Sequence, residues 1–246
     1  MKNYDVAIIG AGPGGIFSAY ELIKLDSSVK VAVFEEGLPL EQRKCPIDGI
    51  KVKSCIHCKT CAIMRGFGGA GAYSDGKYNI TNDFGGSLHE FIGKEHAVEL
   101  MKYVDGINMS NGGEGAKLYS TADTALKKLC LQNQLHLLDA SVRHLGTDKN
   151  YVVLANLYEQ LKDKVDFYFR TSVETIDAKD GGYDLTCADE TYHAKQCIVS
   201  VGRSGSKWIE KVCSNLDIET YSNRVDIGVR VELPAVVFSH LTTEHH

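Results

Sequence analysis

A glycine-rich turn near the N-terminus constrains this chain more than any other feature. The apolar run from Tyr4 to Ile9 is typical of a buried strand, and Gly10 to Gly15 (GAGPGG) follow it directly. Apolar residues then recur at helical spacing from Ile16 to Ile23, and a second β-branched run, 30–34, ends at Glu35. The order of strand, glycines, helix, strand and acid predicts a β-α-β unit of the doubly wound α/β type.

Each residue type in this unit meets a requirement of dinucleotide binding. Gly10 permits the tight turn out of the strand, Gly12 leaves room for a pyrophosphate, and Gly15 lets the helix pack closely on the sheet. The phosphates would lie on free N–H groups at the positive end of the helix dipole. Glu35 could accept hydrogen bonds from both ribose hydroxyls and would repel a 2′-phosphate, which disfavours NADP. The predicted contacts are Gly10, Ala11, Gly12, Pro13, Gly14, Gly15, Glu35 and Glu36.

Length, composition and charge limit the number of domains and the kinds of partner that this chain can have. The chain has 246 residues, 43% of them hydrophobic, which is enough for one large or two modest domains. The 27 basic and 32 acidic residues give a net charge of -5 and are scattered, so we expect neither a nucleic-acid nor a membrane partner. No apolar run approaches the roughly 20 residues of a bilayer span, and no signal-peptide pattern opens the chain. We expect a cytoplasmic protein.

The segment after Glu36 helps to decide whether the dinucleotide is NAD or FAD. An NAD domain would continue with alternating strands and helices, whereas residues 37–86 are long, irregular and rich in glycine and cysteine. Such segments inside a compact domain are usually functional, and this one suits a flavin. An NAD-dependent dehydrogenase that uses the first site directly remains an alternative. A non-catalytic redox- or metal-sensing fragment is another.

Residues 66–77 (GFGGAGAYSDGK) carry a family resemblance. Here the chain resembles FAD-dependent dehydrogenases of the glutathione-reductase-like superfamily. It resembles more narrowly a bacterial group with C-P, C-x-x-C-x-x-C and G-G-A-G-x-x-S-D-G-K segments in this order. The resemblance covers essentially the whole chain. It implies that this segment wraps the FAD pyrophosphate and approaches the isoalloxazine through Gly68, Gly69, Ala70, Gly71, Ser74 and Asp75. A flexible surface loop is the alternative.

The resemblance also implies an activity. It implies transfer of hydride or electrons between the flavin and a nicotinamide, NAD(P)H, or a small organic substrate, or onward to a one-electron acceptor. Arg65, Ser74, Asp75 and Lys77 are near the flavin ring by this analogy alone. No general acid or base is nominated.

The second half of the chain contains further strand patterns. A strand and a turn are expected at 165–173, and strands at 174–178, 183–188 and around Tyr192, with Gly181-Gly182 as a hairpin turn. The resemblance implies that these strands form an inserted β-meander in which the Val173 backbone meets the adenine. An apolar strand at 196–201 returns to the sheet. Gly202 lies where the superfamily has an Ala-Thr-Gly turn, here Ser200-Val201-Gly202, and would contact the cofactor or form an ordinary turn.

Three helical patterns, at 97–104, 122–129 and 154–161, predict helices that turn apolar stripes to a core. Residues 143–148 (RHLGTD) separate the last two and match a further short motif of the narrower group. We expect a basic loop there that contacts a substrate or a nicotinamide phosphate, or else a solvated turn. His144 is the histidine to mutate first.

The eight cysteines fall into two sets. Cys130, Cys187, Cys197 and Cys213 are dispersed and predicted to be small core residues. Cys55-x-x-Cys58-x-x-Cys61 places three thiols close together, and Cys45-Pro46 could supply a fourth. This spacing resembles the cluster-binding run of bacterial ferredoxins and predicts an iron-sulfur cluster beside the flavin. Zinc, a reactive dithiol and unliganded cysteines remain open.

The expected domains follow from these patterns. A Rossmann-like FAD-binding domain with a parallel sheet and the β-meander would comprise 1–86 and 165–215, with a mainly helical insertion at 87–164 and the start of a second, substrate domain at 216–246. Superfamily members close the FAD site with a Gly-Asp turn near the C-terminus, and this chain has no Gly-Asp pair. We therefore expect a truncated chain that ends shortly after a strand-like run at 225–233. Its final histidines could be a tag remnant.

Overall fold

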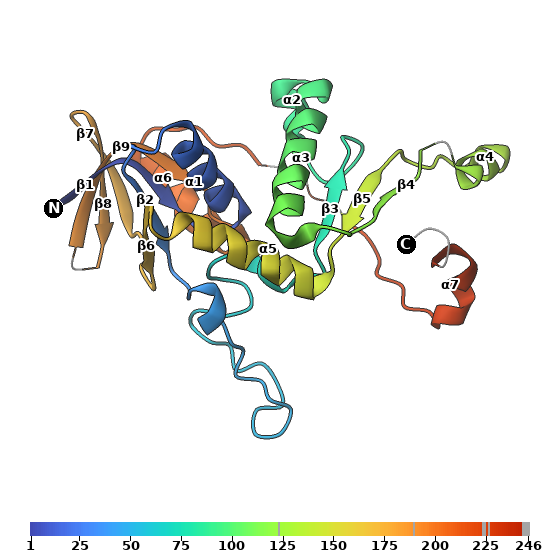
Figure 1. The fold of residues 1–246 in the computed structure, drawn as a ribbon. Helices are drawn as coiled ribbons and strands as arrows, with labels where there is room; N and C mark the ends of the chain where they lie inside the picture. Colours follow the sequence, from blue (N-terminus) through green and yellow to red (C-terminus); the bar gives the residue numbers. More distant parts are fainter. Residues whose placement is uncertain (123, 189, 223–224, 226, 243–246) are drawn as a thin grey trace. The chain divides into compact units, whose positions relative to one another are not determined.

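The computed structural model describes residues 1–122, 124–188, 190–222, 225 and 227–242 (Figure 1). It divides the chain into two compact units. The first comprises Met1–Ser74 with Thr147–Thr220, and the second comprises Asp75–Gly146 with the described residues from Tyr221 onward. Residues 75–86 therefore group with the second unit and residues 147–164 with the first, whereas the sequence patterns divide the chain at 86 and 164. Each unit is considered by itself.

A six-stranded sheet forms the first unit. Its order is β6 (Val165–Phe169), β2 (Val31–Glu35), β1 (Lys2–Ile9), β9 (Glu190–Val199), β8 (Gly182–Cys187) and β7 (Thr175–Lys179). The first four strands are parallel, and the last two continue the sheet antiparallel. All five residues of β2 are buried, as expected for a parallel strand covered on both faces. The predicted α/β fold with a mainly parallel sheet is confirmed.

Strand β9 differs from the prediction of two separate strands. Its ten residues pair antiparallel with β8 near Tyr192 and parallel with β1 along their length, as far as Val199. The residues between, from His193 to Lys195, include no glycine or proline that would break a strand. The last strand of the predicted β-meander and the returning sheet strand are therefore one element.

Helices cover this sheet. Helix α1 (Pro13–Leu25) buries Ile16, Ala19 and Ile23. Helix α5 (Gly146–Leu161) buries Leu154, Leu157 and Leu161 of its predicted stripe and leaves Tyr158 half-buried. Helix α6 (Ser206–Asn215) contributes Val212 to a core cluster that includes Ala32, Phe34 and Leu185. Three 3-10 turns, η1 (Leu40–Gln42), η2 (Gly69–Tyr73) and η4 (Arg203–Gly205), shape the loops beyond the strand ends.

The second unit contains a small antiparallel sheet, in the order β3 (Lys77–Ile80), β5 (Ser141–His144) and β4 (Leu118–Ser120). Its helices are α2 (Leu88–Ile92), α3 (Lys94–Asn108) with a following π-helical turn η3 (Met109–Gly113), α4 (Ala125–Gln132) and α7 (Ala235–Thr242). A partly buried ion pair joins α3 to β5, because Arg143 Nε and Nη2 lie 2.6 and 2.7 Å from the two oxygens of Asp105.

Several predictions are wrong, most of them for the second unit. No residue of α4 is buried, and Leu129 of its apolar stripe is 54% exposed because none of the described residues covers it. The predicted basic loop at 143–148 is the end of β5 and the start of α5. The described residues of 225–233 lie in no strand, since no neighbouring strand pairs with them. Of the four dispersed cysteines, only Cys187 is fully buried.

In the part of the chain that the structure describes, no helix combines the length and the apolar character needed to cross a membrane.

The core assignment gives a stability test. Replacing Leu185, which is 0% exposed, with alanine should lower the free energy of unfolding by about 2–5 kcal/mol, because a cavity is left in the core. Replacing Leu25, which is 81% exposed, should change it by less than about 0.5 kcal/mol. Urea denaturation followed by circular dichroism measures both, and equal losses would contradict the packing described.

Candidate functional site

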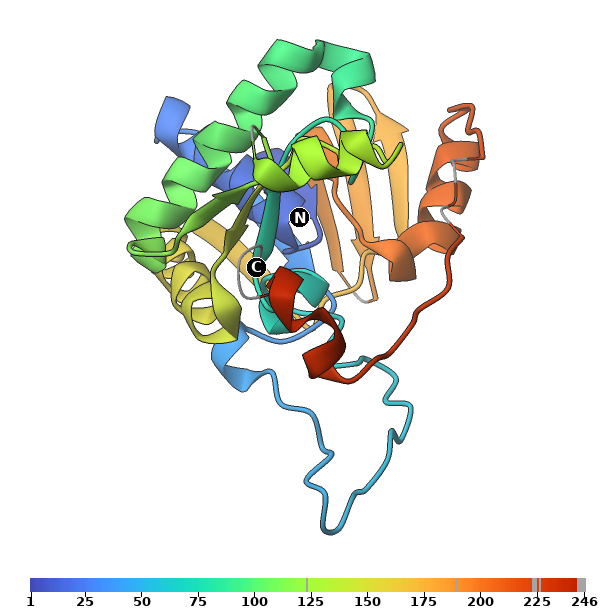
Figure 2. The ribbon, with the colours of Figure 1, turned by 90° about the vertical axis from the view of Figure 1, so that its right-hand side faces the viewer.

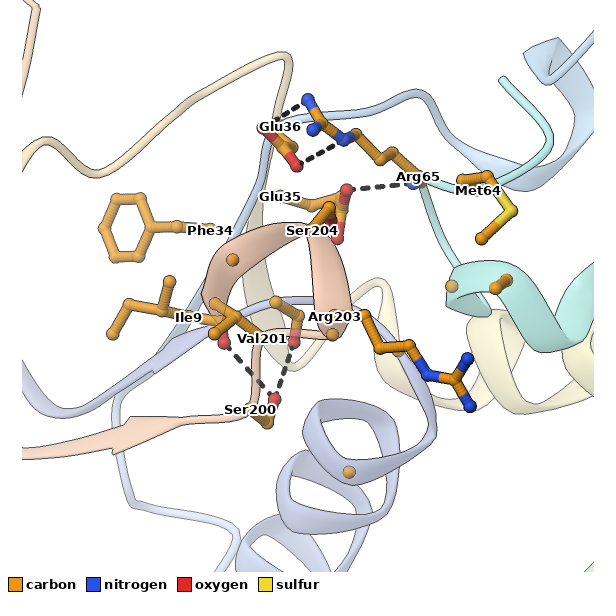
Figure 3. Close-up of a pocket in the computed structure, with 18 of the residues that line it drawn as sticks. Ile9, Phe34, Glu35, Glu36, Met64, Arg65, Ser200, Val201, Arg203 and Ser204 are labelled. Atoms are coloured by element: carbon orange, nitrogen blue, oxygen red, sulfur yellow. Dashed lines mark hydrogen bonds and ion pairs between the residues drawn. The ribbon is translucent and has the colours of Figure 1, made fainter. Parts of the chain in front are cut away.

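A cavity of about 690 Å³ opens at the carboxyl ends of the parallel strands of the first unit (Figure 3). The turns that follow β1, β2, β6 and β9 line it, together with residues 64–66 and 69–71 of the long segment after β2. This edge of an open α/β sheet is where ligands of such folds generally bind. The cavity is therefore the candidate site.

The sequence prediction and the cavity can be compared residue by residue. Among the predicted cofactor-binding residues, those that line the cavity are Gly10, Gly12, Pro13, Gly14, Glu35, Glu36, Gly69, Ala70, Gly71, Val173 and Gly202. Ala11, Gly15, Ser74 and Asp75 do not line it. The structure thus brings together segments that are about 190 residues apart in the chain, as the Ser200 hydrogen bond to Gly10 shows.

Two glycines in this region are required by the protein itself. Gly10 has a φ of +101°, and a Cβ atom there would lie 2.8 Å from the Ser200 carbonyl oxygen. A Cβ atom at Gly15 would lie 1.9 Å from the Gly10 carbonyl oxygen. A side chain at either position would collide with backbone, so these glycines form the turn and the close contact of helix and sheet.

At three other glycines, neither the backbone conformation nor the neighbouring atoms of the protein require glycine. Gly12 and Gly202 have extended backbone, with φ values of −76° and −78°, that any residue can adopt. A Cβ atom at Gly12 would meet only Gly69 Cα at 3.9 Å, one at Gly71 only Pro13 Cγ at 3.9 Å, and one at Gly202 nothing within 4 Å. All three line the cavity. Their missing side chains leave bare backbone facing the cavity, which is what close approach of a ligand requires.

Glu35 has a structural role that the sequence did not reveal. Its side chain is buried, and its Oε1 accepts hydrogen bonds from the N–H groups of Gly37 and Gly66 at 2.8 and 2.9 Å. Its Oε2 accepts one from Ala11 at 2.8 Å. A carboxylate offers about four acceptor positions, so Oε2 retains capacity for a further donor. The predicted ribose contact stays a prediction.

An ion pair lies beside Glu35 (Figure 3). Arg65 Nε lies 3.0 Å from Glu36 Oε1, and Arg65 Nη1 donates to Glu36 Oε2 at 3.1 Å. Burial raises the pKa of Glu36, and the positive charge of Arg65 opposes that rise. Arg65 is therefore held at the end of β2, next to the residue predicted to hold a ribose, in a paired arrangement that residue spacing alone did not indicate.

The turn after β9 contributes residues that the sequence analysis did not assign. Ser200 Oγ donates to the carbonyl oxygens of Ile9 and Gly10 at 3.2 and 3.1 Å, which ties this turn to the glycine turn after β1 (Figure 3). Arg203 and Trp208 also line the cavity. The Ser-Val-Gly pattern marked the position, but only its glycine was assigned a contact.

Other predicted site residues lie elsewhere. Asp75 belongs to the second unit and forms an ion pair with Lys77 at 3.1 Å, and the hydrogen bond from Lys77 is the largest cause of its lowered pKa. His144 Nε2 lies 3.7 Å from Asp75 Oδ2. Arg143 is held by Asp105, so the predicted basic contact at 143–148 has its arginine engaged in an ion pair.

The predicted metal ligands are not brought together. Cys55 and Cys58 are exposed, and Cys45 and Cys61 are half-buried, all as free thiols. Among the described residues no group of three or more histidine, cysteine, aspartate or glutamate side chains could hold a metal ion. The predicted iron-sulfur cluster has no support in this geometry.

Comparisons with known proteins do not assign this chain to a family. No family model matches the chain, and no curated protein matches it. A glycine oxidase from Geobacillus kaustophilus is similar in structure, with a TM-score of 0.49 and 16% identity, over 89% of this chain and 60% of that one. NikD, an amino acid oxidase, has a TM-score of 0.49 and 13% identity, over 86% and 54%.

Thioredoxin reductase of T. acidophilum has a TM-score of 0.33 and 15% identity, over 82% of this chain and 36% of that one. This chain therefore spans less than two thirds of the length of each of these structures. Likeness at such scores and identities carries no functional weight. The evidence for a ligand is the geometry of the cavity itself.

Glu35 provides a test of this geometry. Glu35→Ala should lower the free energy of unfolding by about 3 kcal/mol or more, because three buried N–H groups lose their acceptor. Glu36→Ala removes a partly exposed ion pair and should cost about 1 kcal/mol or less. Chemical denaturation compares the two variants. A Glu35 variant as stable as the Glu36 variant would contradict the role described.

Proposed function

We propose that the cavity binds the adenosine diphosphate half of FAD and that the protein is a flavin-dependent oxidoreductase. The observation that carries this proposal is the set of three glycines, Gly12, Gly71 and Gly202, that line the cavity without any steric or conformational need within the protein. A pyrophosphate lies against backbone N–H groups and cannot tolerate a side chain between. The first unit would then be the cofactor-binding domain.

The residues present fit this half of the cofactor. Gly12 precedes α1, which has no side-chain cap and no acidic residue in its first turn, so its N-terminal N–H groups and dipole are available to an anion. Glu35 Oε2 would accept from the ribose, and the backbone of Val173, which lines the cavity, would meet the adenine. No geometry beyond these positions is assumed.

FAD is favoured over NAD by the second glycine segment. Gly69 packs on the first glycine turn, since a Cβ atom at Gly69 would lie 3.1 Å from Gly12 Cα. The Gly68 N–H donates to the Ala11 carbonyl oxygen at 2.8 Å, which fixes the two segments together. Asn150 Nδ2 donates to the Gly71 carbonyl oxygen at 2.8 Å. The cavity thus has a second fixed backbone wall, which a simple mononucleotide turn lacks.

A flavin held here would supply two-electron hydride transfer and one-electron transfer. The chain's own residues would bind and orient it. A nicotinamide or a small organic molecule is the proposed substrate, and a one-electron acceptor is the proposed alternative partner. An NAD-dependent dehydrogenase that uses the same cavity is the second candidate function, because the glycine turn and Glu35 serve either dinucleotide.

Gly12 allows a test of the cofactor with little effect on the fold. The purified protein should be yellow and release FAD on denaturation. Gly12→Ala should weaken FAD binding at least about tenfold, because a methyl group would occupy the pyrophosphate position. The apo protein should lose no more than about 1 kcal/mol of stability, since a Cβ atom there meets almost nothing. Fluorescence titration with FAD and thermal melts measure the two quantities.

Gly106 in α3 provides a matched control, because it is a glycine where a Cβ atom meets nothing within 4 Å and it lies outside the cavity lining. Gly106→Ala should leave FAD affinity unchanged. Colourless protein that binds NAD but not FAD would overturn the flavin proposal and favour the NAD-dependent dehydrogenase.

A further inference from the structure

The cysteine-rich part of the long segment after β2 is firmly fixed at its base. We refer to residues 44–61 as the cysteine loop. Just before it, Arg43 is 4% exposed and donates from Nε to the Ala62 carbonyl oxygen at 2.9 Å. Its Nη1 and Nη2 donate to the carbonyl oxygens of Phe67 and Ile63 at 2.6 and 2.8 Å. The two ends of the loop are therefore held together by one buried guanidinium.

Beyond this base the loop has little to support it. It contains no helix or strand, and it extends away from the sheet and helices of the first unit in both views (Figures 1 and 2). Its isoleucines are exposed, Ile50 at 80% and Ile56 at 58%. Packing of apolar side chains cannot organise such a loop. A metal ion held by several side chains can organise such a segment, because metal binding and folding are then coupled.

The loop carries the donors for one kind of group. Four of its eighteen residues are cysteines, and all four are free thiols. Around Cys55 the backbone turns sharply, since His57 has a φ of +51° and its N–H donates to Cys55 Sγ at 3.5 Å. A backbone N–H directed at sulfur is the kind of outer-shell contact that orients a thiolate ligand.

The charge of the loop fits a thiolate centre. It contains four lysines and a single carboxylate, Asp48, in a chain whose net charge is -5. Asp48 Oδ1 already accepts from the N–H groups of Ile50, Lys51 and Val52. Oxygen ligands for a hard cation are therefore lacking. Four thiolates on a divalent ion carry a charge of about −2, which nearby lysines would offset.

We propose that Cys45, Cys55, Cys58 and Cys61 bind one Zn²⁺ ion as a closed tetrathiolate site that folds the cysteine loop. The four thiols do not converge in this structure, so binding would close the loop at the same time and displace the thiol protons. Zinc fits better than an iron-sulfur cluster, because the loop has no apolar shell to shield several irons and sulfides from water. The proposal does not depend on the ligand of the cavity.

Metal analysis of the intact chain tests this site directly. Protein incubated with Zn²⁺ and passed through a desalting column should retain about one zinc per chain, and each of C45S, C55S, C58S and C61S should retain less than about a tenth of that amount. C130S, which alters a half-buried thiol outside the loop, should retain all of it. Co²⁺ in place of Zn²⁺ should give the intense thiolate-to-cobalt absorption of a tetrahedral site.

Thiol labelling of the unmodified protein keeps the test independent of any variant's folding. In the zinc-loaded protein the four loop cysteines should be alkylated at least about tenfold more slowly than after treatment with a chelator, since a coordinated thiolate is not free to react. Cys187 and Cys197 should stay unlabelled in both states, because burial raises their pKa to about 11 and about 12.

Retention of no zinc, equal labelling rates with and without chelator, or iron with acid-labile sulfide in anaerobically purified protein would each overturn the zinc site. Loss of zinc in only three of the four serine variants would overturn the ligand set.

Discussion

The buried carboxylate of Glu35 is the interaction on which the rest of the site depends. It accepts hydrogen bonds from backbone N–H groups at three places in the chain. These are Ala11 in the glycine turn, Gly37 just after β2, and Gly66 near the end of the long segment that follows β2. An isolated buried carboxylate is strongly unfavourable, and three amide donors offset that cost. The same three hydrogen bonds join the two glycine segments at one point. They therefore both stabilise the buried charge and fix the backbone that lines the cavity.

The glycines around this anchor fall into two physical classes. Gly10 and Gly15 are required because backbone atoms of the protein already occupy the space a side chain would need. Gly12, Gly71 and Gly202 face the cavity with room to spare. A sequence pattern lists all of them alike. Only the distances from a built Cβ atom show which glycines the fold itself requires and which ones leave space for a ligand. The glycines that leave space for a ligand support the proposed function.

The parts predicted well from sequence are those whose contacts are local in the chain. The strand, turn, helix, strand and acid of residues 4–35 follow one another directly, and each has a recognisable residue pattern. The parts missed depend on distant partners. Ser200 reaches Ile9 and Gly10 across some 190 residues, and β9 is continuous because β1 and β8 flank it. The stripe of α4 has a helical pattern, yet a pattern cannot show whether anything covers it.

Two buried charges explain how an irregular segment can still place residues accurately at the cavity. Glu35 accepts hydrogen bonds from three backbone N–H groups, including that of Gly66. Arg43 donates to three backbone carbonyl oxygens next to the end of the cysteine loop. Because these bonds go to backbone, they hold Arg65 and Gly66 against the cavity whatever the loop beyond them does. The loop is thus free to carry a chemistry of its own. In the sequence, the cysteines and the cavity residues belong to one segment. In the structure, the hydrogen bonds of Glu35 and Arg43 divide that segment into a fixed part that lines the cavity and a loop that carries the cysteines.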